Sequence, residues 1–258
     1  MGCIKKLLFR MKRFGINCVD ADAIAFIQAT NITDNSIQLA VCQLVSDLKT
    51  NSLWAKFHAI YPIVGGNEIA HSYNLINPSL YKTNYPTVSW THSSNGMILN
   101  QYGVSTGINS ATILDKTNSS FGVYSRTNQT DTAMIFYFSY VQISLRRSVD
   151  TFLSDMNDFN GSGARVTTSN TDSSGFFIAQ RNPALLHGHY INGVYKNGNS
   201  SLGLDLAWSG SVGINTKEAV ASGREISFLT IGQSLTDAEN ATLYTIVQAF
   251  QTTLGRQV

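Results

Sequence analysis

The spacing of apolar residues along the chain changes close to Tyr61. Before it, apolar residues recur every three or four positions, which is the spacing of one buried helix face. After it, apolar and polar residues alternate in short runs separated by Gly- and Asn-containing turns, a pattern typical of β-strands. The pattern therefore predicts a basic segment over 1–19, a helical segment over 20–60 and a β-rich body over 61–258.

The helical segment carries start and stop signals for two helices. Asp20 or Asp22 can cap the first helix, because a carboxylate accepts hydrogen bonds from the free N–H groups of the first turn, and Asn31 ends it. Asp34 caps the second helix, which the Thr-Asn-Ser run at 50–52 breaks. These signals predict two short helices in succession.

The second helix has a continuous apolar stripe, and a third short helix is expected over 53–60. The stripe consists of Ile37, Leu39, Val41, Leu44, Val45 and Leu48. An apolar helix face must be buried against another element. We therefore expect the helical segment to cover one edge of the β-rich body.

The first 14 residues combine apolar and basic side chains without an acidic residue. The apolar ones fall at helical spacing, at Ile4, Leu7, Leu8 and Met11. The basic ones are Lys5, Lys6, Arg10, Lys12 and Arg13. A basic amphipathic helix suits an anchor on an acidic surface, either a membrane or a partner protein. The alternative is a frayed terminus with solvated charges.

The β-rich body contains several apolar runs of strand length. They lie at 121–127, 133–139, 142–147, 175–181, 189–198 and 226–231. The strongly apolar run at 133–139 predicts a central strand. Asn192-Gly193 predicts a tight hairpin, since Asn and Gly tolerate the positive φ angles of a type I′ turn. Many short strands with polar turns indicate a β-sandwich or barrel.

The chain is expected to end in a helix. Thr236 and Glu239 form the capping-box pattern, in which each side chain binds the backbone N–H of the other residue. The buried stripe of this helix is predicted to be Leu243, Ile246, Val247 and Phe250. Gly255 lies at its end, where a left-handed residue commonly terminates a helix.

Composition adds two constraints. Charged residues make up 13% of the chain, well below the roughly 25% of average soluble proteins, which suits exposed strands held in an assembly outside a cytoplasm. The net charge of +2 gives no indication of a specific nucleic-acid partner. Cys3, Cys18 and Cys42 all precede the β-rich body, which therefore holds neither a disulfide nor a cysteine metal site. Their odd number leaves one thiol free unless it pairs between chains.

Several motifs together resemble a known class of domain. Gly-Phe-Phe-Ile-Ala-Gln-Arg at 175–181, Tyr-Ile-Asn-Gly-Val-Tyr-Lys-Asn-Gly at 190–198 and the stretch at 226–239 are similar to the second half of concanavalin A-like, laminin G-like jelly rolls. The stretches at 20–29, 53–66 and 243–256 resemble virion structural proteins of bacteriophages of Bacteroidetes hosts. The resemblance covers residues 20–258 and excludes the basic start.

The resemblance implies both a fold and a place of action. The fold would be mainly β, a concanavalin A-like (laminin G-like) β-sandwich jelly roll with an N-terminal helical segment and a short C-terminal helix. The protein would be a non-enzymatic component of a bacteriophage virion, such as a decoration protein, a fibre or spike module, or a tail adaptor. Its partners would be other virion proteins and copies of itself. Such sandwiches often recognise host-surface glycans, which makes a carbohydrate-binding module the alternative.

Aromatic side chains are the candidates for contact with a sugar. Their flat apolar faces match the C–H face of a pyranose ring. Trp208, within Ala-Trp-Ser-Gly-Ser, is expected on a loop rim, and Tyr190 and Tyr195 lie on the predicted hairpin. Packing in the core is the competing role for each of these rings.

Neither catalysis nor a cofactor is expected from the sequence. Glycosidases of this fold place carboxylates in a Glu-x-Asp-x-x-Glu run, which this chain lacks, so a polysaccharide-cleaving enzyme is disfavoured. Asp150, Asp155 and Asp158 could form a weak Ca²⁺ site, or remain solvated loop residues. His187 and His189 would share one strand face, but without a third ligand we expect a pair of histidines at a strand edge.

Overall fold

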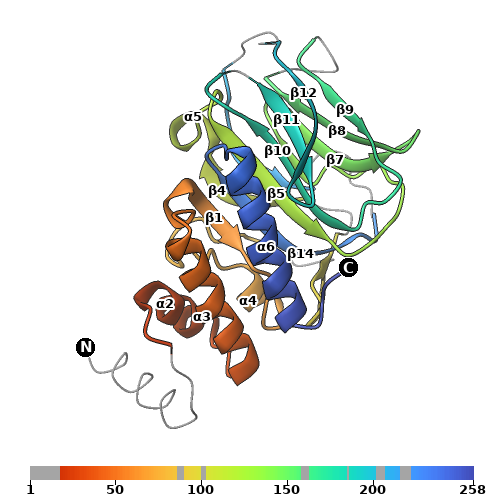
Figure 1. Cartoon of the computed structure of the whole chain (residues 1–258). Helices are drawn as coiled ribbons and strands as arrows, with labels where there is room; N and C mark the ends of the chain where they lie inside the picture. Colours follow the sequence, from red (N-terminus) through yellow and green to blue (C-terminus); the bar gives the residue numbers. More distant parts are fainter. Residues whose placement is uncertain are drawn as a thin grey trace.

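The computed structural model describes residues 18–85, 90–99, 103–157, 163–184, 186–201, 207–215 and 222–258. Two antiparallel sheets, here called sheet A and sheet B, pack face to face, and the long helices lie together on the other side of sheet A (Figure 1). This arrangement confirms the predicted mainly β sandwich with a helical segment before it and a helix after it.

Sheet A has eight strands and sheet B has six. In sheet A the order is β12 (Val194–Asn199), β11 (His187–Ile191), β10 (Gly175–Arg181), β5 (Ser119–Ser125), β14 (Glu225–Gly232), β3 (Met97–Ile98) and β2 (Thr91–His92), with β1 (Phe57–Tyr61) also paired to β14. In sheet B the order is β4 (Val104–Asn109), β13 (Ser211–Ile214), β6 (Phe136–Phe138), β7 (Val141–Arg147), β8 (Thr151–Met156) and β9 (Val166–Ser169).

The turn and strand signals in the β-rich body are confirmed. Ile191 pairs with Val194 across a two-residue turn, in which Asn192 and Gly193 have φ angles of 51° and 76°. The apolar run at 133–139 supplies β6, an inner strand of sheet B. Local turn chemistry and period-two alternation therefore predicted these strands correctly.

The long helices begin and end where the capping residues predict. Asp20 accepts hydrogen bonds at the start of α2 (Ala21–Thr30), and Asn31 adopts a left-handed conformation at its end. Asp34 caps α3 (Asn35–Thr50). Thr236 and Glu239 form the expected capping box of α6 (Asp237–Thr253). None of the described helices is both long enough and apolar enough to cross a membrane.

The predicted third helix is wrong. Only the 3-10 turn η1 (Trp54–Lys56) is helical there, and the following residues form β1, which pairs with β14. Side chains of β1 face two different apolar regions: Ile60 packs among the helices, whereas Ala59 and Tyr61 pack between the sheets. Successive side chains of a strand point to opposite sides, so β1 can place apolar side chains in both cores at once. Pairing with β14 therefore overrides the helical spacing of these residues.

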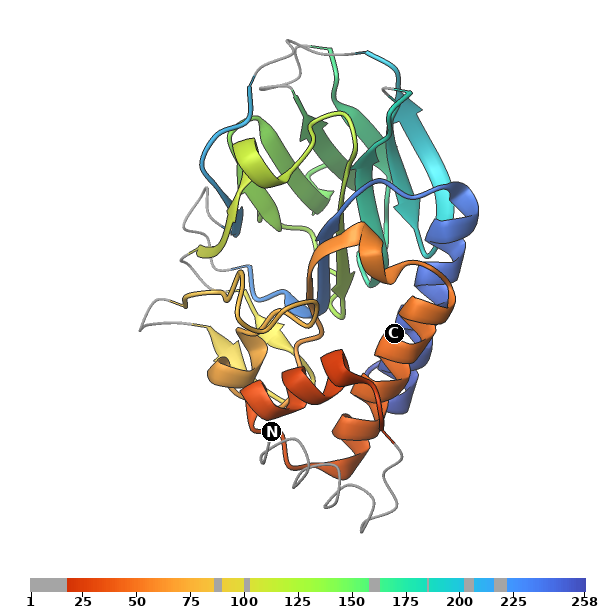
Figure 2. The ribbon, with the colours of Figure 1, turned by 90° about the vertical axis from the view of Figure 1, so that its left-hand side faces the viewer.

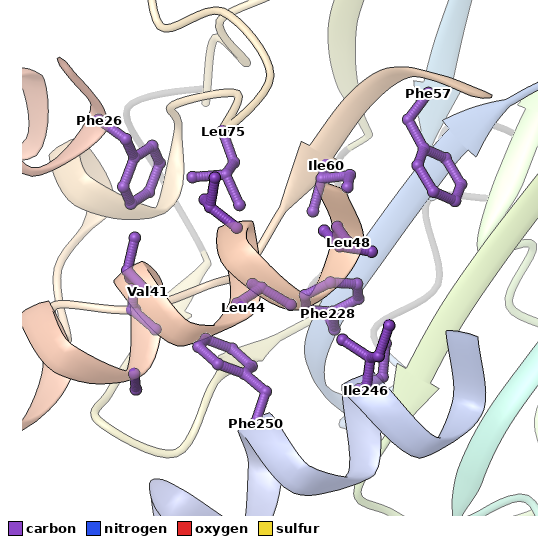
Figure 3. Close-up of a cluster of buried hydrophobic side chains, with 14 of the residues drawn as sticks. Phe26, Val41, Leu44, Leu48, Phe57, Ile60, Leu75, Phe228, Ile246 and Phe250 are labelled. Atoms are coloured by element: carbon purple, nitrogen blue, oxygen red, sulfur yellow. The ribbon is translucent and has the colours of Figure 1, made fainter. Parts of the chain in front are cut away.

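The apolar side chains form two clusters on opposite faces of sheet A. The inner core fills the space between the sheets, and the outer core joins α2, α3 and α6 to sheet A. Figure 3 shows Leu44 and Leu48 of α3 meeting Phe228 of β14 and Phe250 of α6. The helical segment thus shares its core with the sandwich, and the boundary expected at residue 60 falls inside β1.

The predicted stripe of α3 is correct except at one position. Val41, Leu44, Val45 and Leu48 are buried, whereas the side chain of Leu39 is 44% exposed. The buried residues alone fit the three- and four-residue steps of a single helix face, and Leu39 lies beside that face. The predicted stripe of α6 is buried at all four positions.

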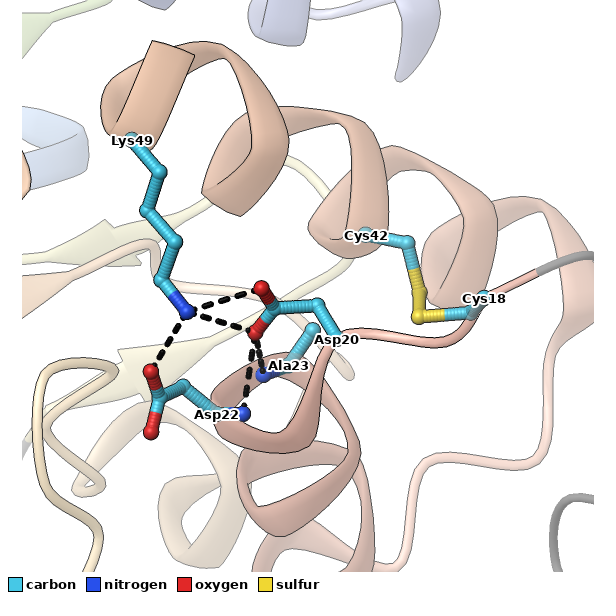
Figure 4. Close-up of a disulfide and its surroundings, with 6 residues drawn as sticks. All are labelled: Cys18, Asp20, Asp22, Ala23, Cys42 and Lys49. Atoms are coloured by element: carbon cyan, nitrogen blue, oxygen red, sulfur yellow. Dashed lines mark hydrogen bonds and ion pairs between the residues drawn. A yellow bond between two sulfur atoms is a disulfide. The ribbon is translucent and has the colours of Figure 1, made fainter.

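A disulfide ties the start of the described chain to α3. Cys18 and Cys42 are bonded, with their Cα atoms 5.7 Å apart (Figure 4). Beside the disulfide, Lys49 of α3 makes ion pairs with Asp20 at 2.7 Å and Asp22 at 2.6 Å. The sequence had left the pairing open. Covalent and ionic links therefore connect the N-terminal end of α2 to α3.

Candidate functional site

The helices cover only one of the two sheets. Outer-face residues of sheet A, such as Tyr124, Phe176 and Phe228, pack in the outer core. Figure 2 shows α3 and α6 on that side of the sandwich, with sheet B on the far side. Among the described residues, sheet B carries only the one-turn helix α5 (Ser110–Ile113), which follows β4. In the described part of the chain, the outer face of sheet B is therefore the strand face without a helical layer, although Gln142, Ser144 and Asp155 on it are buried.

Strand alternation places polar side chains in a row on this outer face. Phe136 and Phe138 of β6 pack in the inner core, so Tyr137 between them points outward. The same alternation turns Gln142 of β7 and Asp155 of β8 outward. Tyr137 pairs in register with Gln142, and Gln142 with Asp155. We call these residues, with Ser144 and Arg165, the sheet B face.

The centre of the sheet B face is a buried carboxylate with several donors. The side chain of Asp155 is 1% exposed. Arg165 donates to it from Nε at 2.7 Å and from Nη2 at 2.6 Å, and Gln142 donates from Nε2. Two parallel N–H···O bonds hold the carboxylate and the guanidinium in one plane. The arginine therefore orients Asp155 rigidly.

Two polar atoms of the sheet B face have no partner. Gln142 Oε1 and Ser144 Oγ are buried and accept or donate no hydrogen bond to any described residue. Because Gln142 donates to Asp155 from Nε2, its Oε1 atom must point away from the carboxylate. Leaving a buried polar group unpaired costs about 1–3 kcal/mol, a cost that a bound hydroxyl group or water would remove.

His187 and His189 do not lie at a sheet edge. Their strand β11 is flanked by β10 and β12, and both side chains are fully buried. The rings reach across to sheet B, where Ser154 Oγ lies 2.7 Å from His187 Nε2 and 2.6 Å from His189 Nε2. The prediction of an edge pair is therefore wrong, because the pair links the two sheets through the inner core.

The hydrogen bonds of this pair determine its tautomers. His187 Nδ1 lies 2.8 Å from the carbonyl oxygen of Ala164, which can only accept. With both rings neutral, Ser154 then donates to His187 and accepts from His189 Nε2. Thr168 donates to His189 Nδ1 at 2.9 Å. Every ring nitrogen is satisfied, so the geometry supports a structural network and not a metal site.

Acid should weaken the fold through His189. Burial, reinforced by His187, lowers the pKa of His189 well below 6.5, so the folded protein keeps this ring neutral. The unfolded chain binds the proton near pH 6.5. The contribution to stability is therefore complete above that pH and is lost as pH falls, by about 1.4 kcal/mol per unit. Urea unfolding at decreasing pH would measure this contribution together with that of His71, whose pKa burial lowers to about 3. An NMR titration of His189 near its ordinary pKa would contradict the prediction.

The aromatic candidates occupy different environments. Trp208 is 5% exposed and its ring packs in the inner core, 5.3 Å from the ring of Phe138, so its expected place on a loop rim is wrong. Tyr190 is 4% exposed and its hydroxyl donates to Asp237 at 2.6 Å. Tyr195 is 41% exposed on β12. Of the three, Tyr195 alone offers substantial ring surface, and ligand contact by any of them stays a prediction.

The other candidate residues are not gathered in one place. Asp150 makes an ion pair with Arg146 at 2.8 Å, whereas Asp155 pairs with Arg165. Asp158 lies outside the described residues, as do Lys5, Lys6, Arg10, Lys12 and Arg13. No group of three metal-ligating side chains occurs among the described residues.

Sequence reasoning did not find Tyr137, Gln142 or Arg165. The available signal was the alternation in 141–147, where Val141, Ile143 and Leu145 face inward and assign Gln142 to the opposite face. Strand order and register were also needed to bring Gln142 beside Asp155. Neither could be deduced from one sequence.

Comparison with known proteins gives structural matches alone. No protein-family model matches the chain, and no curated protein does. The botulinum neurotoxin serotype D binding domain has a TM-score of 0.56 at 14% identity, over 76% of this chain and 53% of that chain. The serotype D ligand binding domain in complex with N-acetylneuraminic acid has a TM-score of 0.54 at 14% identity, over 76% and 52%.

What these structures share with the chain is the fold. The chain spans about half the length of the neurotoxin domains that it matches. At 14% identity the similarity extends to the arrangement of strands and not to individual site residues. The protein is therefore a β-sandwich whose strand arrangement is shared with these neurotoxin binding domains.

Proposed function

We propose that this chain is a non-catalytic glycan-binding module and that the sheet B face holds the glycan. The observation that carries the proposal is the row of outward polar side chains with two buried atoms, Gln142 Oε1 and Ser144 Oγ, that lack partners. A sugar hydroxyl both donates and accepts, so one hydroxyl can satisfy either atom.

The chemistry of the row suits a sugar. Three donors bond to the Asp155 carboxylate, two on Oδ2 and one on Oδ1, so one lone pair of Oδ1 would remain to accept from a sugar hydroxyl that reaches this buried group. Arg165 remains 29% exposed and can donate to a ring oxygen or hydroxyl. Tyr137, next to Gln142 in register, contributes an aromatic ring beside these polar groups. The combination of one rigid carboxylate, its donors and an aromatic neighbour provides orientation as well as apolar contact.

Two further observations support binding without catalysis. One of the similar structures is a ligand binding domain in complex with N-acetylneuraminic acid, and the match covers 52% of that chain. The chain also lacks the carboxylate run with which enzymes of this fold cleave glycosidic bonds.

The substitution Asp155→Asn tests the proposal. We expect at least about tenfold weaker binding to a glycan identified on an array, because a charge-assisted hydrogen bond contributes about 1.5–3 kcal/mol. Isothermal titration calorimetry measures the affinity. The matched control is Asp47→Asn, on α3 in the opposite layer of the molecule.

Loss of folding must be separated from loss of binding, since Asp155 is buried. Arg165→Lys keeps the positive charge but removes the planar fork, so it should weaken glycan binding in a protein whose melting temperature remains close to that of the native chain. An array without any bound glycan, or native affinity in both variants, would refute the proposal.

We further infer that the module is displayed on a bacteriophage particle, with other virion proteins and copies of itself as partners. The support is the resemblance of the stretches at 20–29, 53–66 and 243–256 to phage structural proteins. The apolar faces of α2 and α3 are buried in the outer core, so attachment would use other surfaces. Mass spectrometry of purified particles tests this inference, and absence of the protein from them would contradict it.

A further inference from the structure

A groove lies between α2 and the loop that follows α4 (Glu68–His71). Its volume is about 690 Å³, and its walls come from one face of α2 and from residues 73–79. This space is largely open to solvent and is not an enclosed cavity. This α2 groove lies beside the outer core, on the helical side of the molecule, and shares no lining residue with the sheet B face.

The floor of the α2 groove is low because the outward face of α2 carries small residues. The helix buries Ile24, Phe26 and Ile27 in the outer core. Ala25 and Ala29 therefore face the groove, one turn apart. Outward helix positions usually carry long charged side chains, and such side chains here would fill the space.

The opposite wall is held rigidly by a buried asparagine. Asn74 Oδ1 accepts from the backbone N–H groups of Ile60 and Ile76, both at 3.0 Å. Its Nδ2 donates to the carbonyl of His58 at 3.1 Å. These bonds attach the loop to β1, so the groove is preformed and a ligand need not order it.

One lining side chain has an unused donor. Gln28 lies on the groove side of α2, and its Nε2 atom is buried without a hydrogen-bond partner among the described residues. Across the groove, Ser79 and Asn77 supply further polar groups, and Asn77 Oδ1 already accepts from the Ser79 backbone at 2.9 Å. Both walls therefore carry polar side chains, although Gln28 Nε2 becomes accessible only when the Gln28 side chain moves.

One acidic and one basic side chain lie near the groove, and each already has a partner. Asp22 makes its ion pair with Lys49, and the ammonium of Lys82 lies 4.2 Å from the centre of the Tyr73 ring. An anionic ligand would meet the Asp22 carboxylate, and a cationic ligand would meet Lys82. A neutral ligand with several hydroxyl groups avoids both penalties, and it would accept from Gln28 after a rotation of this half-buried side chain exposes the Nε2 atom.

We propose that the α2 groove is a second binding site, for a neutral mono- or disaccharide. The site does not depend on the sheet B face, because the two are lined by different elements. Adjacent sugar hydroxyls, each of which donates and accepts, match the donor of Gln28, the acceptor of Asp22 and the hydroxyl of Ser79. The apolar side of the sugar would lie over Ala25 and Ala29.

The test uses the side-chain amide signals of two glutamines in one NMR spectrum of the full chain. The Gln28 amide reports on the α2 groove and the Gln142 amide on the sheet B face, and Gln28→Glu and Gln142→Glu assign them. The probes are cellobiose, lactose, maltose and chitobiose at millimolar concentration, with glucuronic acid as the charged comparison. We expect a neutral disaccharide to shift the Gln28 amide.

A groove-filling variant checks the location. Ala25→Phe should weaken this binding by more than about tenfold while the fold is kept, because position 25 is exposed on the helix. The control is Ala238→Phe, an exposed alanine of α6 that does not line the groove. An undiminished shift in Ala25→Phe would overturn the proposal.

The two signals separate this proposal from the glycan site on sheet B. A shift of Gln142 alone would refute the α2 groove and leave the sheet B face intact. A shift of Gln28 alone would support the groove and count against the sheet B face. If only glucuronic acid moves the Gln28 amide, the site is not neutral and the proposal is wrong.

Discussion

The substitution Phe228→Ala is expected to lower the free energy of unfolding by about 3–5 kcal/mol, the range for an aromatic side chain removed from a packed core. Phe228 of β14 is fully buried in the outer core. Its ring lies 5.9 Å from that of Phe250 on α6 and 6.4 Å from that of Phe176 on β10. The truncation would leave a cavity between the helices and sheet A.

This variant also tests whether helices and sandwich unfold together. Trp54 packs against the outer core and Trp208 lies in the inner core, so fluorescence reports on both regions while circular dichroism follows the helices. One shared transition in urea is expected for the native chain and for the variant. Val194→Ala, at a position 56% exposed, is the control and should change stability by less than about 0.5 kcal/mol. Separate transitions for helices and sheets would contradict the shared core.

Removal of the disulfide is expected to cost about 3.5 kcal/mol of stability. Cys18 and Cys42 are separated by 24 positions, and closing a loop of that length removes this much chain entropy from the unfolded state. The double variant Cys18→Ala, Cys42→Ala should unfold at lower urea concentration than the native chain. The native chain should also lose stability in a reducing agent.

The third cysteine provides the control. Cys3→Ala leaves the disulfide in place and should keep the stability of the native chain, and thiol titration of the unfolded native chain should give a single free thiol. Equal stability of the double variant and the native chain would show that the link does not restrict the unfolded state.

The sequence predicted best those features that depend on neighbouring residues. The caps at Asp20, Asp34 and Thr236 use side chains that bond to the backbone two or three residues away. The hairpin at Asn192-Gly193 depends on two φ angles. Such interactions are complete within a few residues, so no knowledge of the rest of the fold is needed.

Features that depend on distant pairing could not be predicted. Helical spacing over 53–60 gave way to β1 because β14, more than 160 residues later in the chain, supplies a strand partner. Trp208 has the small polar neighbours of a loop residue, yet the rings of Phe121 and Phe138 enclose it. The sheet B face likewise needs three strands brought side by side. In each case the deciding contact is remote in sequence.

The chain of bonds from Thr168 to Ala164 also limits how the two sheets can be aligned. In that chain the hydroxyl of Ser154 lies between the two rings, where it donates to His187 and accepts from His189. A slip of β8 by one residue would present Leu153 or Asp155 to the histidines and turn Ser154 outward. Leucine offers no hydrogen bond, and a carboxylate would require an added proton on a ring. The hydrogen bonds of Ser154 therefore favour one alignment of β8 against β11, whereas apolar packing does not distinguish polar partners.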